Sequence, residues 1–307
     1  MSATSSPTPL LRPPALDLGL LAIAVLAVST SGPLVAATTA PALAIAFWRS
    51  ILGSAVTAPF GLRAARARIA GTSRREWLLM LAAGGLLGAH FATWVPSLRY
   101  TSVASATALV ATQPIWAALL ARRAGVRLSR RAWIGIAVAF SGVLALTGVD
   151  VATDPVSLIG DGLALAGGML SAGYVTVGER ARKSVPASQY NAAVYAIAAG
   201  GLLLCCLIGR QPLVGFSAHD WLLILALTAG AQLLGHSLVN TVLETTPATV
   251  VSLAILFEVP GAVLFASWWL GQTPTLALIP AILLLFVGLA MVIWSGAPRV
   301  PTESPPV

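Results

Sequence analysis

Four ionisable side chains lie inside long apolar stretches of the sequence: Arg49, His90, His236 and Glu258. An ionisable group at the centre of a membrane helix costs about 2.5–3.5 kcal/mol on insertion scales, so it is a functional candidate by default. A carboxylate there can take up a proton or face a cation, and a guanidinium can hold a carboxylate. An imidazole titrates near neutral pH and can relay protons. These four residues are the first candidates for chemistry.

Glu258 and Arg49 each allow a functional and a structural interpretation. Glu258 is a candidate protonation switch, or a partner for a cationic group of a substrate. It is equally suited to be a structural carboxylate beside Pro260. Arg49 is a candidate ligand for a carboxylate substrate, or an ion-pair partner of Glu258. The alternative is an arginine that ties helices together or extends its charged head toward the membrane surface.

Polar side chains recur at helical spacing on two segments. His90 and Trp94 are four residues apart and share one helix face. The residues Gln232, His236 and Asn240 form a polar stripe with the same spacing, which would be costly against lipid. Together with Gln113, Tyr174 and Glu258, these five residues are predicted to line a cavity that binds substrate. The competing interpretation is hydrogen bonding between helices without a role in binding.

Two prolines, Pro114 and Pro260, fall within apolar segments. Proline removes a backbone hydrogen bond and kinks or breaks a helix. Because the two lie 146 residues apart at matching places, they are candidate hinges, and a fixed bend is the alternative.

The composition identifies the elements that must position these residues. Of the 307 residues 57% are hydrophobic and only 9% are charged, against about 25% charged in soluble domains. A membrane helix needs about 20 mainly apolar residues. The sequence predicts an all-α integral membrane protein with ten such helices, at residues 16–37, 41–61, 77–97, 101–121, 131–149, 158–178, 188–208, 220–241, 247–269 and 275–295. The polar ends, 1–15 and 296–307, are predicted to be disordered cytoplasmic tails.

The basic residues alternate between the connections of this map. If the N-terminus is cytoplasmic, fifteen of the 18 Lys and Arg residues lie in the stretches 62–76, 122–131 and 179–187 or in the tails, all on the cytoplasmic side. This distribution follows the positive-inside rule. It predicts a multi-pass protein of the plasma membrane with both termini in the cytoplasm.

The two halves of the chain share features at one spacing. His90 and His236 are 146 residues apart, as are Pro114 and Pro260, while Asp17 and Asp161 are 144 apart. The spacing predicts two repeats of five helices, 16–149 and 158–295. Because five is odd, the second repeat enters the membrane from the opposite side. Inverted repeats of this kind build transporters with a central site near the midplane of the membrane.

Four stretches carry a more specific pattern. They read AFWRSILGS (46–54), GLLGAHFATWVPSLRYTSVASATALVATQPIWAALL (85–120), IGIAVAFSGVLAL (134–146) and LLGHSLVNTVLETTPATVVSLAILFEVPGAVLFASWWLGQ (233–272). With the helix count, they resemble the EamA-type family of the drug/metabolite transporter superfamily over roughly residues 16–295. The resemblance implies ten helices around a central cavity and movement of small metabolites, often export of amino acids or their relatives.

The chain departs from the family pattern at two places. The family usually shows Glu-Pro in the ninth helix and a Glu after the Leu-Gly that ends it, whereas this chain has Glu258-Val259-Pro260 and Gln272. Family roles at those positions are therefore not carried over. The chain also lacks a Glu in its first helix, so the proton coupling of small multidrug transporters is not carried over either.

These patterns favour a secondary transporter that exports or exchanges small organic metabolites, such as amino acids, related compounds or drugs, by alternating access. The sequence has no phosphate loop, no HExxH and no paired acidic motif, so no enzyme activity, cofactor, metal or nucleic-acid partner is expected. The expected partners are a small-molecule substrate and the lipid bilayer, with the chain as a monomer or a homodimer. The alternatives are a membrane enzyme acting on lipids or isoprenoids, and a non-transporting sensor or assembly partner.

Overall fold

The computed structural model describes residues 15–67, 71–125, 127–246, 251 and 254–295, and these residues form helices joined by short connections. Eight helical spans are long and apolar enough to cross a membrane. They are Ala15–Ala37, Ala42–Arg66, Arg74–Ser97, Val103–Arg123, Arg130–Thr153, Ser157–Arg182, Ala187–Ile208 and Ala218–Val242. The predicted multi-pass, all-helical membrane architecture is therefore confirmed for this part of the chain.

The individual helices follow the predicted segments within a few residues. They are α1 (Ala15–Ser29), α2 (Ser31–Ala37), α3 (Ala42–Arg66), α4 (Arg74–Ser97), α5 (Val103–Val110), α6 (Gln113–Arg123), α7 (Arg130–Thr153), α8 (Ser157–Arg182), α9 (Ala187–Ile208), α10 (Ala218–Leu227), the π-helical η1 (Thr228–His236), α11 (Ser237–Val242), α13 (Glu258–Leu270) and α14 (Leu278–Trp294). The first residues of the predicted segment 247–269 lie outside the described part. The shorter α13 and α14 occupy the last two predicted segments.

Several spans are interrupted rather than continuous. The span Val103–Arg123 breaks at Ala111–Thr112, and Pro114 then lies in the first turn of α6, where a proline needs no backbone hydrogen bond. Pro260 lies likewise in the first turn of α13, just after a turn at 256–257. Both prolines therefore follow a break instead of kinking a continuous helix. Another interruption is η1, a wider π-helical segment of the kind that occurs often at functional sites.

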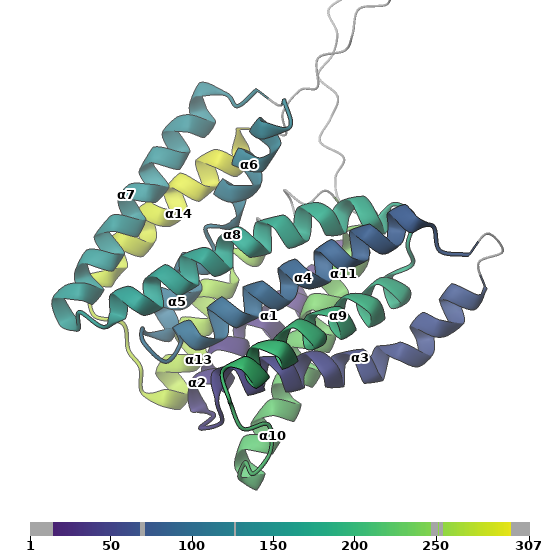
Figure 1. Ribbon diagram of the computed structural model, residues 1–307. Coiled ribbons are helices and arrows are strands. Elements are labelled where there is room, and N and C mark those ends of the chain that lie inside the picture. The colour runs from purple at the N-terminus through teal and green to yellow at the C-terminus, as the bar shows by residue number, and fades with distance from the viewer. Residues whose placement is uncertain (1–14, 68–70, 126, 247–250, 252–253, 296–307) are drawn as a thin grey trace, which may run out of the picture.

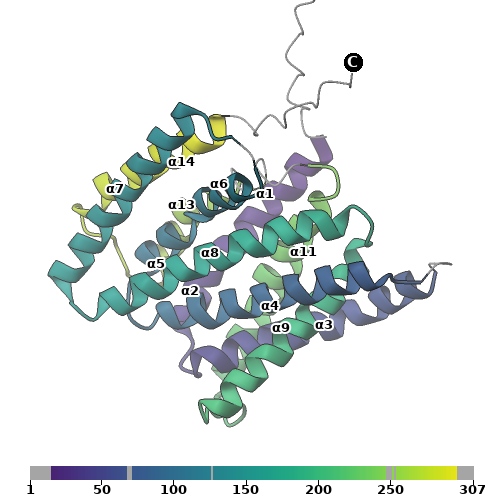
Figure 2. The same cartoon turned by 45° about the horizontal axis from the view of Figure 1, so that its top comes forward.

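The helices form two layers and a separate pair (Figure 1). In the front layer α8, α4, α9 and α3 lie side by side, each packed on the next. Behind them, α1 packs on η1, α11 and α13, and α5 packs on α13. The third group, α7 and α14, runs as a pair along one side of the bundle in both views (Figures 1 and 2).

Small residues bring α7 and α14 into direct backbone contact. A Cβ added at Gly288 of α14 would lie 2.2 Å from the backbone nitrogen of Ala139 and 2.6 Å from the carbonyl oxygen of Gly135, both on α7. Helices in a bilayer associate through such packing because lipid tails leave little hydrophobic drive between them. The pair therefore depends on the missing side chain at Gly288.

Gly288→Ala should lower the free energy of unfolding by about 1–3 kcal/mol, because the new methyl group overpacks the α7–α14 contact. Thermal unfolding of the purified protein in detergent measures this change. Gly148→Ala is the matched control, since a Cβ at Gly148 of α7 meets nothing within 4 Å. Equal stability of the two variants would show that α7 and α14 are not in backbone contact.

Candidate functional site

A cavity of about 60 Å³ lies between the two halves of the chain. Six of the predicted binding residues line it: His90, Trp94, Gln113, Tyr174, His236 and Glu258. They come from α4, α6, α8, η1 and α13, while α1 and α2 add Val28 and Ser31. The remaining lining is apolar apart from Ser171. The structure thus brings polar side chains from six helical elements together around one small space.

Aromatic rings form one wall of this cavity. The rings of His90 and Trp94 are nearly parallel, with centroids 6.1 Å apart, as their shared helix face requires. His236 meets Phe91 and Tyr174 edge-on, at centroid distances of 5.5 Å and 6.4 Å. His90 Nδ1 is also 2.9 Å from the carbonyl oxygen of Gly167 on α8. This contact fixes the orientation of the His90 ring through Nδ1 and does not involve Nε2.

Arg49 lies behind the wall and does not line the cavity. Its side chain is fully buried, and its Nε donates a 2.9 Å hydrogen bond to Gln232 Oε1. The guanidinium carbon also sits 4.2 Å from the centroid of the Phe91 ring, a cation–π contact. Among the described residues no ion pair joins Arg49 to Glu258, so the predicted pairing is limited to a longer-range attraction.

Gln232 and Asn240 support the wall from the same side. Gln232 holds Arg49, and Asn240 accepts a 2.7 Å hydrogen bond from the Tyr174 hydroxyl and donates one of 2.7 Å to Asn191. The predicted stripe therefore divides in two. His236 lines the cavity, whereas Gln232 and Asn240 are fully buried behind it and hold Arg49 and Tyr174 by hydrogen bonds.

Two hydrogen-bond donors among the lining residues have no acceptor within the described structure. They are Trp94 Nε1 and Gln113 Nε2, although Gln113 Oε1 accepts a 2.8 Å hydrogen bond from Ser171. Most buried donors in native structures are paired, and leaving one unpaired costs about 1–3 kcal/mol. Such donors, in a cavity that also holds the Glu258 carboxyl group, suit a solute with both acceptor and cationic groups.

Sequence reasoning missed four residues that shape the site. Ser31 and Ser171 line the cavity, but a lone serine in an apolar segment carries no sequence signal. Phe91 likewise looks like ordinary apolar sequence. Asn191 had a usable signal, since Tyr195 lies four residues further on and the two form a polar face of α9 toward η1 and α11.

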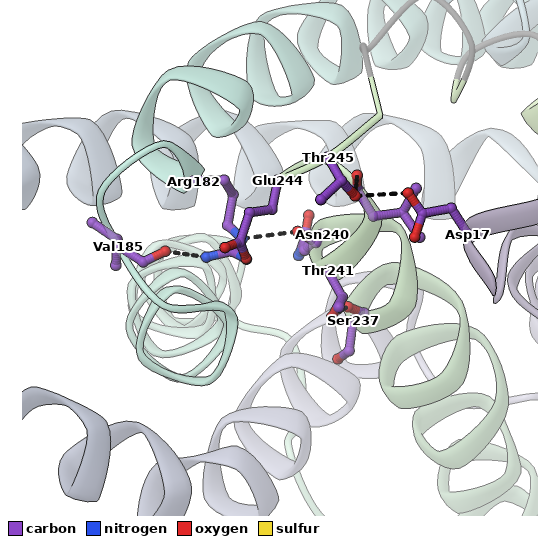
Figure 3. Close-up of polar contacts among 9 residues, drawn as sticks. Asp17, Arg182, Val185, Ser237, Asn240, Thr241, Glu244 and Thr245 are labelled. Atoms are coloured by element: carbon purple, nitrogen blue, oxygen red, sulfur yellow. Dashed lines mark hydrogen bonds and ion pairs between the residues drawn. The ribbon is translucent and has the colours of Figure 1, made fainter. Parts of the chain in front are cut away.

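Hydrogen bonds close the bundle at the end where α3, α6 and α8 end and α4 and α7 begin, here called the arginine-rich end because arginines gather at these helix ends. Figure 3 shows polar contacts at this end. Asp17 Oδ2 at the start of α1 accepts hydrogen bonds from the hydroxyls of Thr245 and Thr246, at 2.6 Å and 2.7 Å. Arg182 at the end of α8 pairs with Glu244 at 2.5 Å and donates to the carbonyl oxygens of Asn240 and Val185. These contacts tie α1 and α8 to the residues that follow α11.

Other contacts close the opposite end of the bundle. Asp220 at the start of α10 accepts hydrogen bonds from the backbone nitrogen and the hydroxyl of Thr39, at 2.7 Å and 2.8 Å. Arg99, after α4, donates to the carbonyl oxygens of Thr38 and Ala40 at 2.7 Å and 2.8 Å. The connection after α2 is thus held by residues from both halves of the chain.

Comparisons with known proteins agree with this architecture. A crystal structure described only as "Crystal structure of protein" superposes with a TM-score of 0.64 at 22% sequence identity, covering 91% of this chain and 97% of the other. At that identity the likeness concerns the fold alone. No curated protein matches the sequence. The model of the EamA-like transporter family matches twice, over residues 16–148 and 158–294, and the chain therefore belongs to the EamA-like transporter family.

Proposed function

We propose that the chain is a secondary transporter that moves small organic solutes across the plasma membrane by alternating access. Membership of the EamA-like family supports a membrane transporter of the drug/metabolite type. The observation that carries the proposal of alternating access is the cavity, which takes its polar lining from both halves of the chain. A site shared by two repeats is suited to open toward either side as the repeats rock against each other.

The proposed scaffold is ten membrane helices in a five-plus-five inverted repeat, with the boundaries 16–149 and 158–295. The helix contacts support this scaffold, because the main contacts between helices have an equivalent when each helix is replaced by its counterpart in the other half. The pairing of α4 with α8 corresponds to that of η1 with α1, and α5 with α8 corresponds to α13 with α1. The pairs α3–α9 and α7–α14 each join equivalent helices of the two repeats. A pseudo-two-fold axis through the cavity accounts for all of these pairings.

Reporter fusions should place the arginine-rich connections and both termini in the cytoplasm. A reporter active only in the cytoplasm is expected to be active after Gly71, Gly125 and Ser295, and inactive after Thr153, Val214 and Thr273. The positive-inside distribution is the physical reason for this orientation. Equal activity after Thr273 and Ser295 would mean that α14 does not cross the membrane, and would remove the ten-helix scaffold.

The cavity chemistry points to the substrate class. Glu258 offers a carboxyl group for a cationic group, while Trp94 Nε1 and Gln113 Nε2 offer donors for an acceptor. The rings of Trp94, His236 and Tyr174 offer apolar faces. This combination fits small metabolites with an amino group and a polar group, such as amino acids and their derivatives, or amphipathic cationic drugs.

The small volume of the cavity supports a closed step of the proposed cycle. Ligand pockets usually measure about 300–1,000 Å³, whereas this cavity measures about 60 Å³ and is tied at both ends. Substrate entry then requires release of one set of end contacts and separation of the helices there. The breaks ahead of Pro114 and Pro260 lie beside the cavity, where the proposed hinges would act.

Substrate binding is tested by thermal unfolding with a panel of amino acids, amines, nucleosides and cationic drugs. A ligand at 100 times its Kd stabilises the native protein by about 2.7 kcal/mol. For a cationic ligand, Glu258→Gln should weaken binding about tenfold or more, a loss of about 1.4 kcal/mol, because the carboxylate partner is removed. His236→Ala should also weaken binding because the ring lines the cavity.

The controls are Glu179→Gln on α8 and His219→Ala, whose side chain is exposed on α10, and both should bind normally. Hits must then move across proteoliposome membranes that contain the protein. A ligand that binds all four variants with one affinity would place the binding site outside this cavity.

Weakening the arginine-rich end should open the cavity from that side. Asp17→Ala removes the acceptor for Thr245 and Thr246, and a hydrogen bond to a charged group contributes about 1.5–3 kcal/mol. A cysteine at Val239 in the cavity, with Cys205 and Cys206 replaced by Ala, should therefore react about tenfold faster with a membrane-impermeant thiol reagent from the arginine-rich side. Asp154→Ala, at an exposed position, is the control. Faster reaction only from the opposite side would contradict the assigned closure.

A further inference from the structure

Two buried carboxylates lie together at the end of the bundle opposite the arginine-rich end. Asp150 is near the end of α7 and is 9% exposed, and Asp161 is in the second turn of α8 and is 3% exposed. Asp150 faces the hydroxyls of Ser105 and of Thr101, which lies in the turn between α4 and α5. Asp161 faces those of Thr101 and Thr147, and the two carboxylates interact with each other electrostatically. Burying one unpaired carboxylate is already expensive, so two adjacent ones require a compensating positive charge.

The oxygen atoms around these carboxylates are poorly satisfied. Both Oδ atoms of Asp161, Asp150 Oδ2, Thr101 Oγ1 and Ser157 Oγ have no hydrogen-bond partner of regular geometry in the described part of the chain. Ser157 is itself only 5% exposed and lies four residues before Asp161, so its hydroxyl shares the helix face of that carboxylate. Thr101 sits close to α8, because a Cβ at Gly160 would be 2.8 Å from its backbone nitrogen.

The equivalent place in the other half has a single carboxylate. Asp17 and Thr245 lie 144 residues from Asp161 and Thr101, respectively. Asp17 Oδ2 receives two short hydrogen bonds from Thr245 and Thr246, and no second carboxylate is needed there. Asp150 has no carboxylate counterpart 146 residues on, where the sequence has Gly296. The second acidic residue is therefore an addition specific to one end of the molecule.

The described basic side chains near this end are engaged elsewhere. Arg99, the nearest along the chain to Thr101, donates to the carbonyl oxygens of Thr38 and Ala40 and interacts with Asp220. No described Lys or Arg forms an ion pair with Asp150 or Asp161. The positive charge must then come from a proton or a bound cation.

We propose that Asp150 and Asp161, with the hydroxyls of Thr101 and Ser157 and with Ser105 beside Asp150, form a binding site for a hard cation, Na⁺ or Ca²⁺. All of these groups present oxygen, which hard cations prefer to nitrogen or sulfur ligands. Two carboxylates balance one Ca²⁺, or one Na⁺ together with one proton. A bound cation would hold α7, α8 and the α4–α5 turn together, and this site stands independently of the substrate cavity.

Ion-dependent thermal unfolding of the full-length protein in detergent tests the site. NaCl, KCl and CaCl₂ are titrated in turn at constant ionic strength, with choline chloride as the balancing salt. We expect a saturable rise of the melting temperature with Na⁺ or with Ca²⁺, and the two titrations identify which cation binds. In the matched control Asp154→Asn, at an exposed position between α7 and α8, the rise should persist.

Substitutions within the proposed site test whether the cation binds there. Asp161→Asn and Asp150→Asn, which keep side-chain shape, should each weaken the apparent cation affinity tenfold or more. Ser157→Ala, which removes only a neutral ligand, should weaken it severalfold and keeps the site testable if the Asn variants fold poorly. Direct binding of radioactive Na⁺ or Ca²⁺ to the same proteins provides a second readout.

Three results would overturn the proposal. The first is equal melting temperatures in all salts. The second is an ion effect that survives in both Asp variants. The third is stabilisation by acid alone without any effect of Na⁺ or Ca²⁺, which would mean that a shared proton supplies the missing charge.

Discussion

The lack of water in a bilayer is the constraint on which this structure depends. Each polar group placed in the membrane must find its partner within the protein. Arg49 meets this demand in part, since its Nε bonds Gln232 of η1 and its guanidinium lies over Phe91 of α4, while Nη2 has no partner among the described residues. Those partners then hold the histidines, because Phe91 meets His236 edge-on and neighbours His90. The cavity wall is thus organised outward from one buried charge.

The proposed two-fold relation between the repeats accounts for the convergence of polar lining on one place. Lining residues pair at a nearly constant spacing: His90 with His236 and Val28 with Tyr174 at 146 residues, and Gln113 with Glu258 at 145. Residues near a pseudo-two-fold axis meet their own counterparts across it. A polar residue near that axis lies next to its counterpart from the other repeat, so the two can share one polar region. A polar residue far from the axis would face lipid in both repeats. The cavity is the region where polar side chains cost least.

Much of the fold could be predicted from the sequence because an apolar run of about 20 residues has few alternatives in a membrane. The site was accessible only in part. His90, Trp94 and His236 stood out as polar groups at helical spacing, and all three line the cavity. The sequence does not distinguish residues that line the cavity from residues that hold the lining in place. It therefore groups Gln232 and Asn240 with His236, although both lie behind the cavity wall. That division depends on the π-helical η1 and on contacts with α3, α8 and α9, which are properties of packing rather than of spacing.

The departures from symmetry are as informative as the symmetry itself. A perfect repeat would give both ends of the bundle the same contacts, and the two open forms would then be equal in free energy. In this chain Arg182 pairs with Glu244 at one end, while Arg99 binds backbone carbonyls at the other. Asp17 is satisfied by hydroxyls, whereas Asp161 is joined by Asp150. Charge-assisted contacts of different strength at the two ends set different costs for opening each of them. If the two repeats rock against each other as proposed, these differences between the two ends favour one open form over the other.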